Sequence, residues 1–264
     1  MSAQSTGFTR QMKSEMTKMR TDSVGNSVLL LTFLGSVAWG VFNAYITIAY
    51  QDPTEAATNP RVPAGGLAQI GFSGLMVWSV LVLLNSKTKG FWNMRVLVQP
   101  RRSVLSIATL VHLTAWSVVF AVVTVLVSTV AAVVVVEMLG HDSSSLIGTP
   151  GEVGTVLVQM VGFAVGVTWF TAGWALICNN IGYAISVVVF WPFVGEGMFP
   201  SEGSLAWLRE FLPFVNALAW YQGDKELQLP WPAPMGLVYF LLLSLILAVV
   251  GVWLRRKETL DLSS

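Results

Sequence analysis

Residues 87–102 of the chain read KTKGFWNMRVLVQPRR and lie between two long apolar runs. This short stretch holds five of the fifteen Lys and Arg residues in the chain. It therefore forms a compact, charged and partly apolar surface in a sequence that is otherwise typical of membrane proteins. A water-soluble partner would find its best point of attachment here.

Within this stretch, Phe91, Met94 and Val98 recur at the spacing of one helix face. Pro100 cannot continue a helix, because it lacks an N–H group and disfavours helical backbone in the residue before it. The pattern predicts a short helix over residues 90–99, where basic side chains meet anionic lipid or a cytosolic protein. The alternative is a positively charged loop that fixes membrane topology and has no other role.

The composition excludes several classes of protein. Hydrophobic residues make up 54% of the 264 residues and charged residues only 11%, which is unlike a soluble domain. The net charge of +1 gives no overall field that would attract nucleic acid. One cysteine cannot form an intramolecular disulfide, and with two histidines it cannot supply a structural zinc site. The first 25 residues are polar and lack the apolar core of a signal peptide.

Six apolar segments predict an all-α, polytopic integral membrane protein that forms a single transmembrane domain over residues 1–264. A helix of roughly 20 residues crosses a bilayer, so most of these segments fit one crossing each. The third segment is too long for one simple crossing, and the fifth contains Pro192, which predicts a kink or an early stop. The predicted spans are 28–50, 67–85, 104–136, 155–178, 181–198 and 235–254.

The first element, over residues 8–22, is predicted to be an amphipathic helix. Its apolar residues fall within about 80° of arc at 100° per residue, with basic residues on the far side. We expect this helix to lie in the membrane plane with its basic face toward lipid headgroups. The alternative is a soluble juxtamembrane helix packed on its own protein. The apolar residues are Phe8, Met12, Met16 and Met19, and the basic ones are Arg10, Lys13 and Arg20.

The distribution of charge predicts the orientation. If the N-terminus is cytoplasmic, twelve of the fifteen basic residues lie inside and ten of the fourteen acidic residues lie outside. The inverted topology would place nearly all the positive charge on the wrong side of the membrane. We therefore expect both termini to be cytoplasmic.

The junction between the fourth and fifth spans is short and uncharged. Asn179 and Asn180 are predicted to cap the two helix ends, the alternative being a polar lining for a transport path. In the fourth span, Gly162, Gly166 and Gly173 share one helix face, which permits close approach of a neighbouring helix. We expect that face to pack within the chain, with a dimer contact as the alternative.

The external segment 199–234 is rich in aromatic residues suited to the membrane–water boundary. Ser204 is positioned to cap a helix, and Pro213 to break one, which predicts one or two short helices dipping into the outer leaflet. Such helices would either complete the fold as a lid or shape the exit of an apolar substrate. The sequence leaves both roles open.

Motifs of known enzymes do not occur in the chain. No Gly-Lys pair is followed by Ser or Thr, and there is no Gly-x-Ser-x-Gly or His-Glu-x-x-His pattern. The spans lack the charged residues of ion-coupled carriers. We expect Glu196 to be a solvated carboxylate at a turn, the alternative being a buried proton carrier, and His112 to be a hydrogen-bonded packing residue. An enzyme, a cofactor site and a metal site are therefore not expected, and any energy for transport would come from a cytosolic nucleotide-hydrolysing partner.

The order of these elements resembles the permease subunits of bacterial type-2 ABC exporters. Residues 14–22, SEMTKMRTD, resemble the S-E-x-x-K-x-R opening of that family, and residues 98–103, VQPRRS, resemble its x-x-P-x-x-R/S element before the third span. The family usually carries a Glu shortly before the glycine of the coupling segment, where this chain has Lys87 and Lys89.

The resemblance implies a multi-pass protein of the bacterial plasma membrane, with residues 90–100 as a cytosolic coupling helix that meets a separate ATP-binding subunit. A second copy of the chain, or a related permease, would enclose the pathway for a drug, lipid, glycan or peptide. The competing class is a non-transporting scaffold or sensor that recruits a cytosolic protein; a third, an autonomous secondary transporter, requires coupling residues that the spans lack. The residues expected to contact the ATP-binding partner are Phe91, Trp92, Met94, Arg95, Val98, Pro100, Arg101, Glu15 and Lys18.

Overall fold

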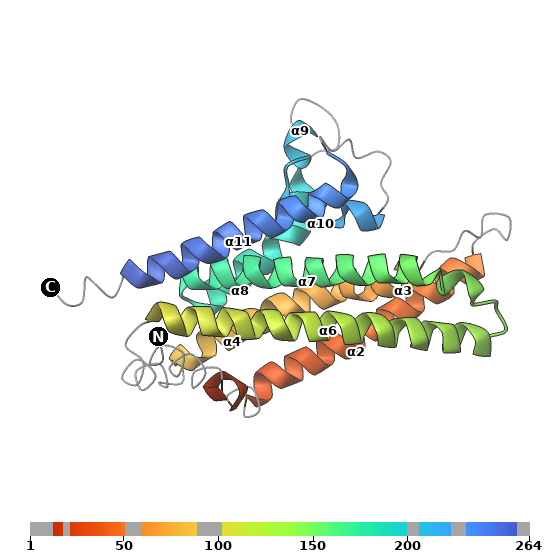
Figure 1. The fold of residues 1–264 in the computed structure, drawn as a ribbon, viewed down its shortest axis with the longest axis horizontal. Coiled ribbons are helices and arrows are strands. Elements are labelled where there is room, and N and C mark those ends of the chain that lie inside the picture. Colours follow the sequence, from red (N-terminus) through yellow and green to blue (C-terminus); the bar gives the residue numbers. More distant parts are fainter. Residues whose placement is uncertain are drawn as a thin grey trace.

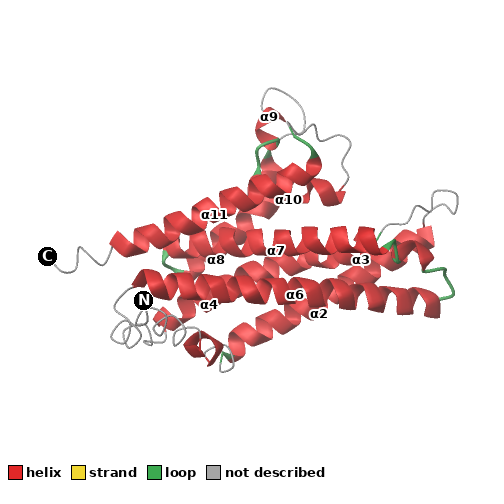
Figure 2. Ribbon diagram, in the orientation of Figure 1, coloured by secondary structure: helices red, strands yellow, loops and turns green. Residues whose placement is uncertain are grey.

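The computed structural model describes residues 13–17, 22–50, 60–88, 102–199, 206–222 and 231–257. These residues form helices and connecting turns, and the described part of the chain contains no strand (Figures 1 and 2). The long helices are α2 (Ser23–Tyr50), α4 (Phe72–Thr88), α6 (Arg102–Met138), α7 (Pro150–Cys178) and α11 (Ala233–Lys257). The shorter ones are α3 (Arg61–Gly66), α8 (Ile181–Phe190), α9 (Ala206–Arg209) and α10 (Pro213–Gln222).

Two helices contain π-helical turns, in which the backbone N–H bonds to the carbonyl five residues earlier. The turn η2 (Leu67–Gly71) joins α3 to α4 without interruption, so residues 61–88 form one helix. The turn η4 (Trp191–Gly195) continues α8 and leads into the 3-10 turn η5 (Glu196–Met198). A further 3-10 turn, η3 (Ser144–Leu146), lies between α6 and α7.

Five helices in the described ranges are long and apolar enough to cross a membrane, judged by length and composition. They cover the first four predicted spans and the last, and the fifth predicted span, 181–198, corresponds to the shorter apolar helix Ile181–Gly195. Pro192 explains why that helix is short, because a proline ring clashes with the carbonyl four residues earlier in α-helical geometry. The expected early stop is confirmed: α8 ends at Phe190 and continues only as the wider π turn.

The helix α6 has 37 residues and is continuous (Figure 1). At 1.5 Å per residue it is about 55 Å long, whereas the hydrocarbon core of a bilayer is about 30 Å thick. A helix of this length must therefore tilt or extend beyond the hydrocarbon, as its sequence predicted.

The helix α7 lies at the centre of the bundle and contacts α4, α6, α8 and α11. Its glycine face packs within the chain, which confirms the interpretation made from the sequence. A Cβ at Gly166 would lie 2.5 Å from the Phe240 ring, and a Cβ at Gly173 would lie 2.7 Å from the backbone of Leu247, both on α11. The absence of side chains at these positions is what lets the two helices approach so closely.

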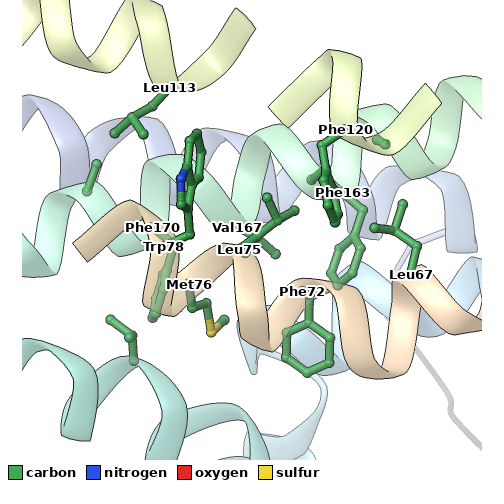
Figure 3. Packing of buried hydrophobic residues seen from close by; sticks show 14 of the residues in the cluster. Leu67, Phe72, Leu75, Met76, Trp78, Leu113, Phe120, Phe163, Val167 and Phe170 are labelled. Atoms are coloured by element: carbon green, nitrogen blue, oxygen red, sulfur yellow. The ribbon is translucent and has the colours of Figure 1, made fainter. Parts of the chain in front are cut away.

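The core between α4, α6 and α7 is built from large apolar side chains (Figure 3). Trp78 and Phe163 are fully buried, and Phe72 lies 5.9 Å from Phe163 between ring centroids. A second aromatic group joins α7, α10 and α11, where Phe240 lies 6.1 Å from Phe163 and 5.1 Å from Phe214. This aromatic group fixes α10 against the two long helices.

The turn between α7 and α8 is capped by its two asparagines, as predicted. Asn179 ends α7 with left-handed backbone at a φ of 54°, and its N–H bonds to the Ala175 carbonyl. Asn180 begins α8, and its side-chain oxygen accepts a hydrogen bond of 3.2 Å from the Tyr183 N–H. Asn179 therefore caps α7 through its backbone, and Asn180 caps α8 through its side chain.

We expect Asn179→Ala to lower the free energy of unfolding by about 1 kcal/mol, because alanine lacks the short polar side chain that lets asparagine adopt left-handed backbone. Asn179→Gly is the matched control and should leave the stability unchanged or raise it slightly, since glycine adopts this conformation freely. Thermal unfolding of the detergent-solubilised protein measures the difference. Equal destabilisation by both variants would contradict this account and point to a role of the amide side chain.

The segment before α11 forms two short helices, α9 and α10, in agreement with the expectation of short helices there. Pro213 begins α10 rather than ending a helix, which suits a residue whose missing N–H is not needed in the first turn. Ser204 lies outside the described residues. The depth of α9 and α10 in the membrane stays a prediction.

Candidate functional site

The structure contains a groove of about 440 Å³ on the side of the bundle, open to its surroundings. Four helices form its walls: α2, the continuous helix of residues 61–88, the helix Ile181–Gly195 and α10. The lining residues are Trp39 from α2, Ala68, Gln69 and Ile70 from η2, Phe72 from α4, Pro192 and Phe193 from η4, and Phe214 and Leu218 from α10. Both π-helical turns thus contribute to the same groove, and such turns are often found at functional sites.

The wall formed by α2 and η2 depends on small residues where the two helices cross. A Cβ at Gly66 would overlap the Ser36 carbonyl oxygen, and one at Gly74 would overlap the Thr32 side chain. The hydroxyls of Thr32 and Ser36 each donate a 2.7 Å hydrogen bond to a carbonyl of their own helix. Their polarity is satisfied within α2, so they can face another helix at close range.

A single polar pair lies on the apolar surface of the groove. The Trp39 indole N–H donates a hydrogen bond of 2.6 Å to the Gln69 side-chain oxygen. Phe72 forms the floor, stacked on Phe193 with ring centroids 5.3 Å apart and 6.1 Å from Phe214. An apolar, aromatic groove with one orienting polar group is the usual composition of a site for an apolar or amphipathic small molecule.

Glu196 lies just past the end of the helix Ile181–Gly195 and joins two walls of the groove. Its carboxylate accepts hydrogen bonds of 3.0 Å from the Trp191 indole N–H, 3.0 Å from the Phe214 N–H and 2.8 Å from the Val215 N–H. We call these three contacts the Glu196 clamp. Two of the three donors are N–H groups in the first turn of α10, where the helix itself offers no acceptor.

The Glu196 carboxyl is only 4% exposed, which corrects the expectation of a solvated side chain. Burial raises its pKa to about 7, although the hydrogen bonds from Phe214, Val215 and Trp191 act in the opposite direction. The flanking glycines suggested a turn, but the sequence carried no sign that the start of α10 covers this carboxylate from 18 residues away.

Further polar contacts join α10 to the chain around it. The Trp231 indole N–H donates a 2.9 Å hydrogen bond to Asn216 Oδ1, and Asn216 Nδ2 donates in turn to the Leu212 carbonyl at 2.9 Å. The Tyr239 hydroxyl donates a 2.9 Å hydrogen bond to the Phe211 carbonyl. The indole, amide and hydroxyl groups in these contacts are neutral. Among the described side-chain contacts to α10, only that of Glu196 involves a carboxylate.

The residues predicted to contact a partner lie almost entirely outside the described ranges. This applies to Lys18, Phe91, Trp92, Met94, Arg95, Val98, Pro100 and Arg101. The ends that flank the predicted coupling helix are described: α4 ends at Thr88 and α6 begins at Arg102, at the end of the bundle where α2 begins and α11 ends (Figure 1). The prediction for these eight residues stays a prediction.

Glu15 is the exception, because it lies in the helical residues 13–17 and its side chain is fully buried. This burial is within the single chain, and the predicted contact of Glu15 with a partner stays a prediction. Met16 beside it is 52% exposed, as an apolar residue facing lipid would be. The remainder of the predicted interfacial helix, 8–12 and 18–21, lies outside the described residues.

Arg255, near the end of α11, makes a buried contact that the sequence did not predict. It is 5% exposed, and its Nε donates a 2.8 Å hydrogen bond to the Leu176 carbonyl in the last turn of α7. A cation at this position satisfies a carbonyl that has no partner within its own helix and opposes the negative end of the helix dipole. From the sequence, the basic residues at the end of α11 indicated only the orientation of the chain in the membrane.

The outward-facing side chains of the long helices are apolar, with Leu31, Val130 and Ile246 each more than 60% exposed. In water such surfaces would aggregate, whereas in lipid they are solvated. Together with the five helices of membrane-spanning length, they define a multi-pass helical membrane protein. No protein-family model and no curated protein matches the chain.

Proposed function

We propose that this protein is the membrane-spanning permease subunit of an ATP-driven exporter of the type-2 ABC class that its sequence resembles. It would work with a separate ATP-binding subunit and with a second permease copy or a related permease. Hydrolysis of ATP would occur in the partner, and this chain would supply the path through the membrane.

The observation that carries the proposal is where charge lies on the apolar helices. Each Asp, Glu, Lys and Arg of α2, α3, α4, α6, α7, α8 and α11 lies in the first or last three residues of its helix. These helices therefore offer no carboxylate or amine at mid-membrane depth for coupling to an ion gradient. The nearest exception is the buried Glu196, just past the helix Ile181–Gly195. A transporter built this way needs its energy from a partner, and the basic residues gather at the end that a cytosolic partner would reach.

The groove indicates which kind of substrate the permease would carry. Its volume of about 440 Å³ falls in the range of small-molecule sites, and its walls are aromatic and aliphatic. An apolar segment of the substrate, such as an alkyl chain or aromatic ring, would replace lipid there. The Trp39–Gln69 pair would orient a polar group on the same molecule.

Purification tests the proposed assembly directly. We expect the protein, extracted in mild detergent, to co-purify with an ATP-binding chain, and ATP to change the stability of the complex. A stable assembly that transports without any nucleotide-binding chain would overturn the proposal. A partner that binds without any effect of ATP would favour the scaffold class instead.

We expect Phe91→Asp to weaken binding of the ATP-binding subunit at least tenfold, because burying a carboxylate in an apolar contact costs more than about 1.4 kcal/mol. The variant should still reach the membrane. Ile147→Asp is the matched control, because it places the same charge on an exposed apolar residue at the opposite end of the bundle. Unchanged partner binding by Phe91→Asp would show that the binding surface for the ATP-binding subunit lies elsewhere.

A further inference from the structure

The Glu196 clamp is a contact between two walls of the groove. On one side is η4, which contributes Pro192 and Phe193 to the lining. On the other is the start of α10, where Phe214 both donates to the carboxylate and lines the groove. The position of α10 relative to η4 therefore depends on this buried carboxylate.

Phe214 in the first turn of α10 lies 5.2 Å from Phe170 on α7 and 6.1 Å from Phe72 on α4 between ring centroids. The rest of α10 packs against α11. Gly236 lets that packing be close, since a Cβ there would lie 2.5 Å from the Asn216 carbonyl oxygen. These contacts would persist if the clamp broke. Loss of the clamp would remove the hydrogen bonds that join the first turn of α10 to Glu196, and α10 would then be held by the ring contacts of Phe214 and by α11.

We propose that Glu196 is a positioning residue that holds α10 against η4 and keeps the groove narrow, and that breaking its hydrogen bonds lets α10 move and widens the groove. The claim about α10 is independent of any partner. Only its use, as a gate for substrate, rests on the proposed function.

The chemistry of the carboxyl gives the direction in which pH acts. Its pKa of about 7 in the closed groove lies above the ordinary 4.5, so the closed state binds a proton more readily than the released state. Between these two values the closed state loses stability as pH rises, by up to about tenfold in its equilibrium constant per pH unit. The closed state is therefore most stable below neutral pH and loses stability on approach to pH 7, because burial of the charged carboxylate costs more than its three hydrogen bonds regain.

Other charged groups near the clamp come from the elements packed around it. Tyr239 on α11 interacts electrostatically with the carboxylate, and Arg209 and Glu210 lie in the segment that leads into α10. A transition in the motion of α10 that is lost in Glu196→Gln, which leaves these neighbours unchanged, would therefore report on Glu196.

Hydrogen–deuterium exchange on the full chain in lipid nanodiscs, without any partner, tests the proposal between pH 5 and 8.5. After correction for the intrinsic exchange rate, we expect the amides of residues 214–219 to exchange at least tenfold faster at pH 8 than at pH 5. Glu196→Gln should abolish this pH dependence, because the amide does not titrate. Glu196→Ala should speed exchange in α10 about 5- to 30-fold at pH 5, because α10 loses the side chain that accepts hydrogen bonds from its first turn.

Glu152→Gln is the matched control. Glu152 also serves a helix N-terminus, where it caps α7 with Thr149, but it is exposed and distant in sequence from α10. This variant should leave exchange in α10 and its pH dependence unchanged. Exchange in the middle of α7 should be the same in all variants, which separates release of α10 from general unfolding.

Two results would overturn the proposal: a corrected exchange rate in α10 that does not vary with pH, or a pH dependence that survives in Glu196→Gln. Because no ATP-binding subunit is present, neither result bears on whether the protein belongs to an exporter. Conversely, failure of the co-purification would leave the clamp in place and remove only its role as a substrate gate.

Discussion

Gly66→Ala is expected to destabilise the protein by about 3 kcal/mol or more, or to prevent its recovery as a folded species. The added Cβ would overlap the Ser36 carbonyl oxygen and would lie 2.8 Å from the Gly40 nitrogen. Both are backbone atoms of α2, which cannot rotate away as a side chain can. The two helices would have to separate, and the wall of the groove formed by α2 and η2 would open with them.

The control is Gly154→Ala in the first turns of α7, where a Cβ would have nothing within 4 Å. Helix propensity favours alanine over glycine by about 1 kcal/mol at both positions, so propensity alone predicts that both variants are stabilised. Thermal unfolding in detergent distinguishes the two effects. A gain in stability for Gly66→Ala would show that α2 and α3 are not in the close contact described.

Phe240→Ala is expected to cost about 2 kcal/mol of folding free energy and to loosen α10 as well. Phe240 is fully buried and lies between Phe163 and Phe214, the latter a lining residue of the groove. In a soluble protein the loss would be larger, because the favourable free energy of transferring the ring from water into the core would also be lost. Between helices already in lipid that part is nearly absent, and the cost of the cavity remains.

Leu242→Ala provides the comparison on the same helix, since Leu242 is 57% exposed on the outer face of α11. We expect a change below about 0.5 kcal/mol, as is usual for exposed positions. Unfolding by a denaturing detergent measures both variants on one scale. A larger loss for Leu242→Ala than for Phe240→Ala would mean that α11 turns the opposite face to the bundle.

Several local features were predictable because their cause lies within a few residues. Asn179 and Asn180 cap the helices on either side of them, and Pro192 ends the α-helical part of α8. The glycine face of α7 was visible as a helical repeat, and its close contact with α11 is as expected. Steric and hydrogen-bonding rules that act over one helical turn suffice for all of these.

The groove and its clamp were not predictable in the same way. Trp39, Gln69, Phe193 and Phe214 come from four separate elements, and no periodicity relates them. Glu196 illustrates the reason: its glycine neighbours predict a turn open to solvent, yet α10 covers the carboxylate and raises its pKa. The environment of an ionisable group depends on which distant segment packs over it.

The amino-acid sequence by itself determined that the chain is helical, that its apolar segments are suited to lipid, and that its charges lie at the ends of those segments. These properties follow from composition and from interactions within one helix. Only the tertiary structure decided which helices adjoin, where a groove is left between them, and which side chains meet across it. Those outcomes depend on how the shapes of whole helices fit together, and a linear pattern of residues does not contain that fit.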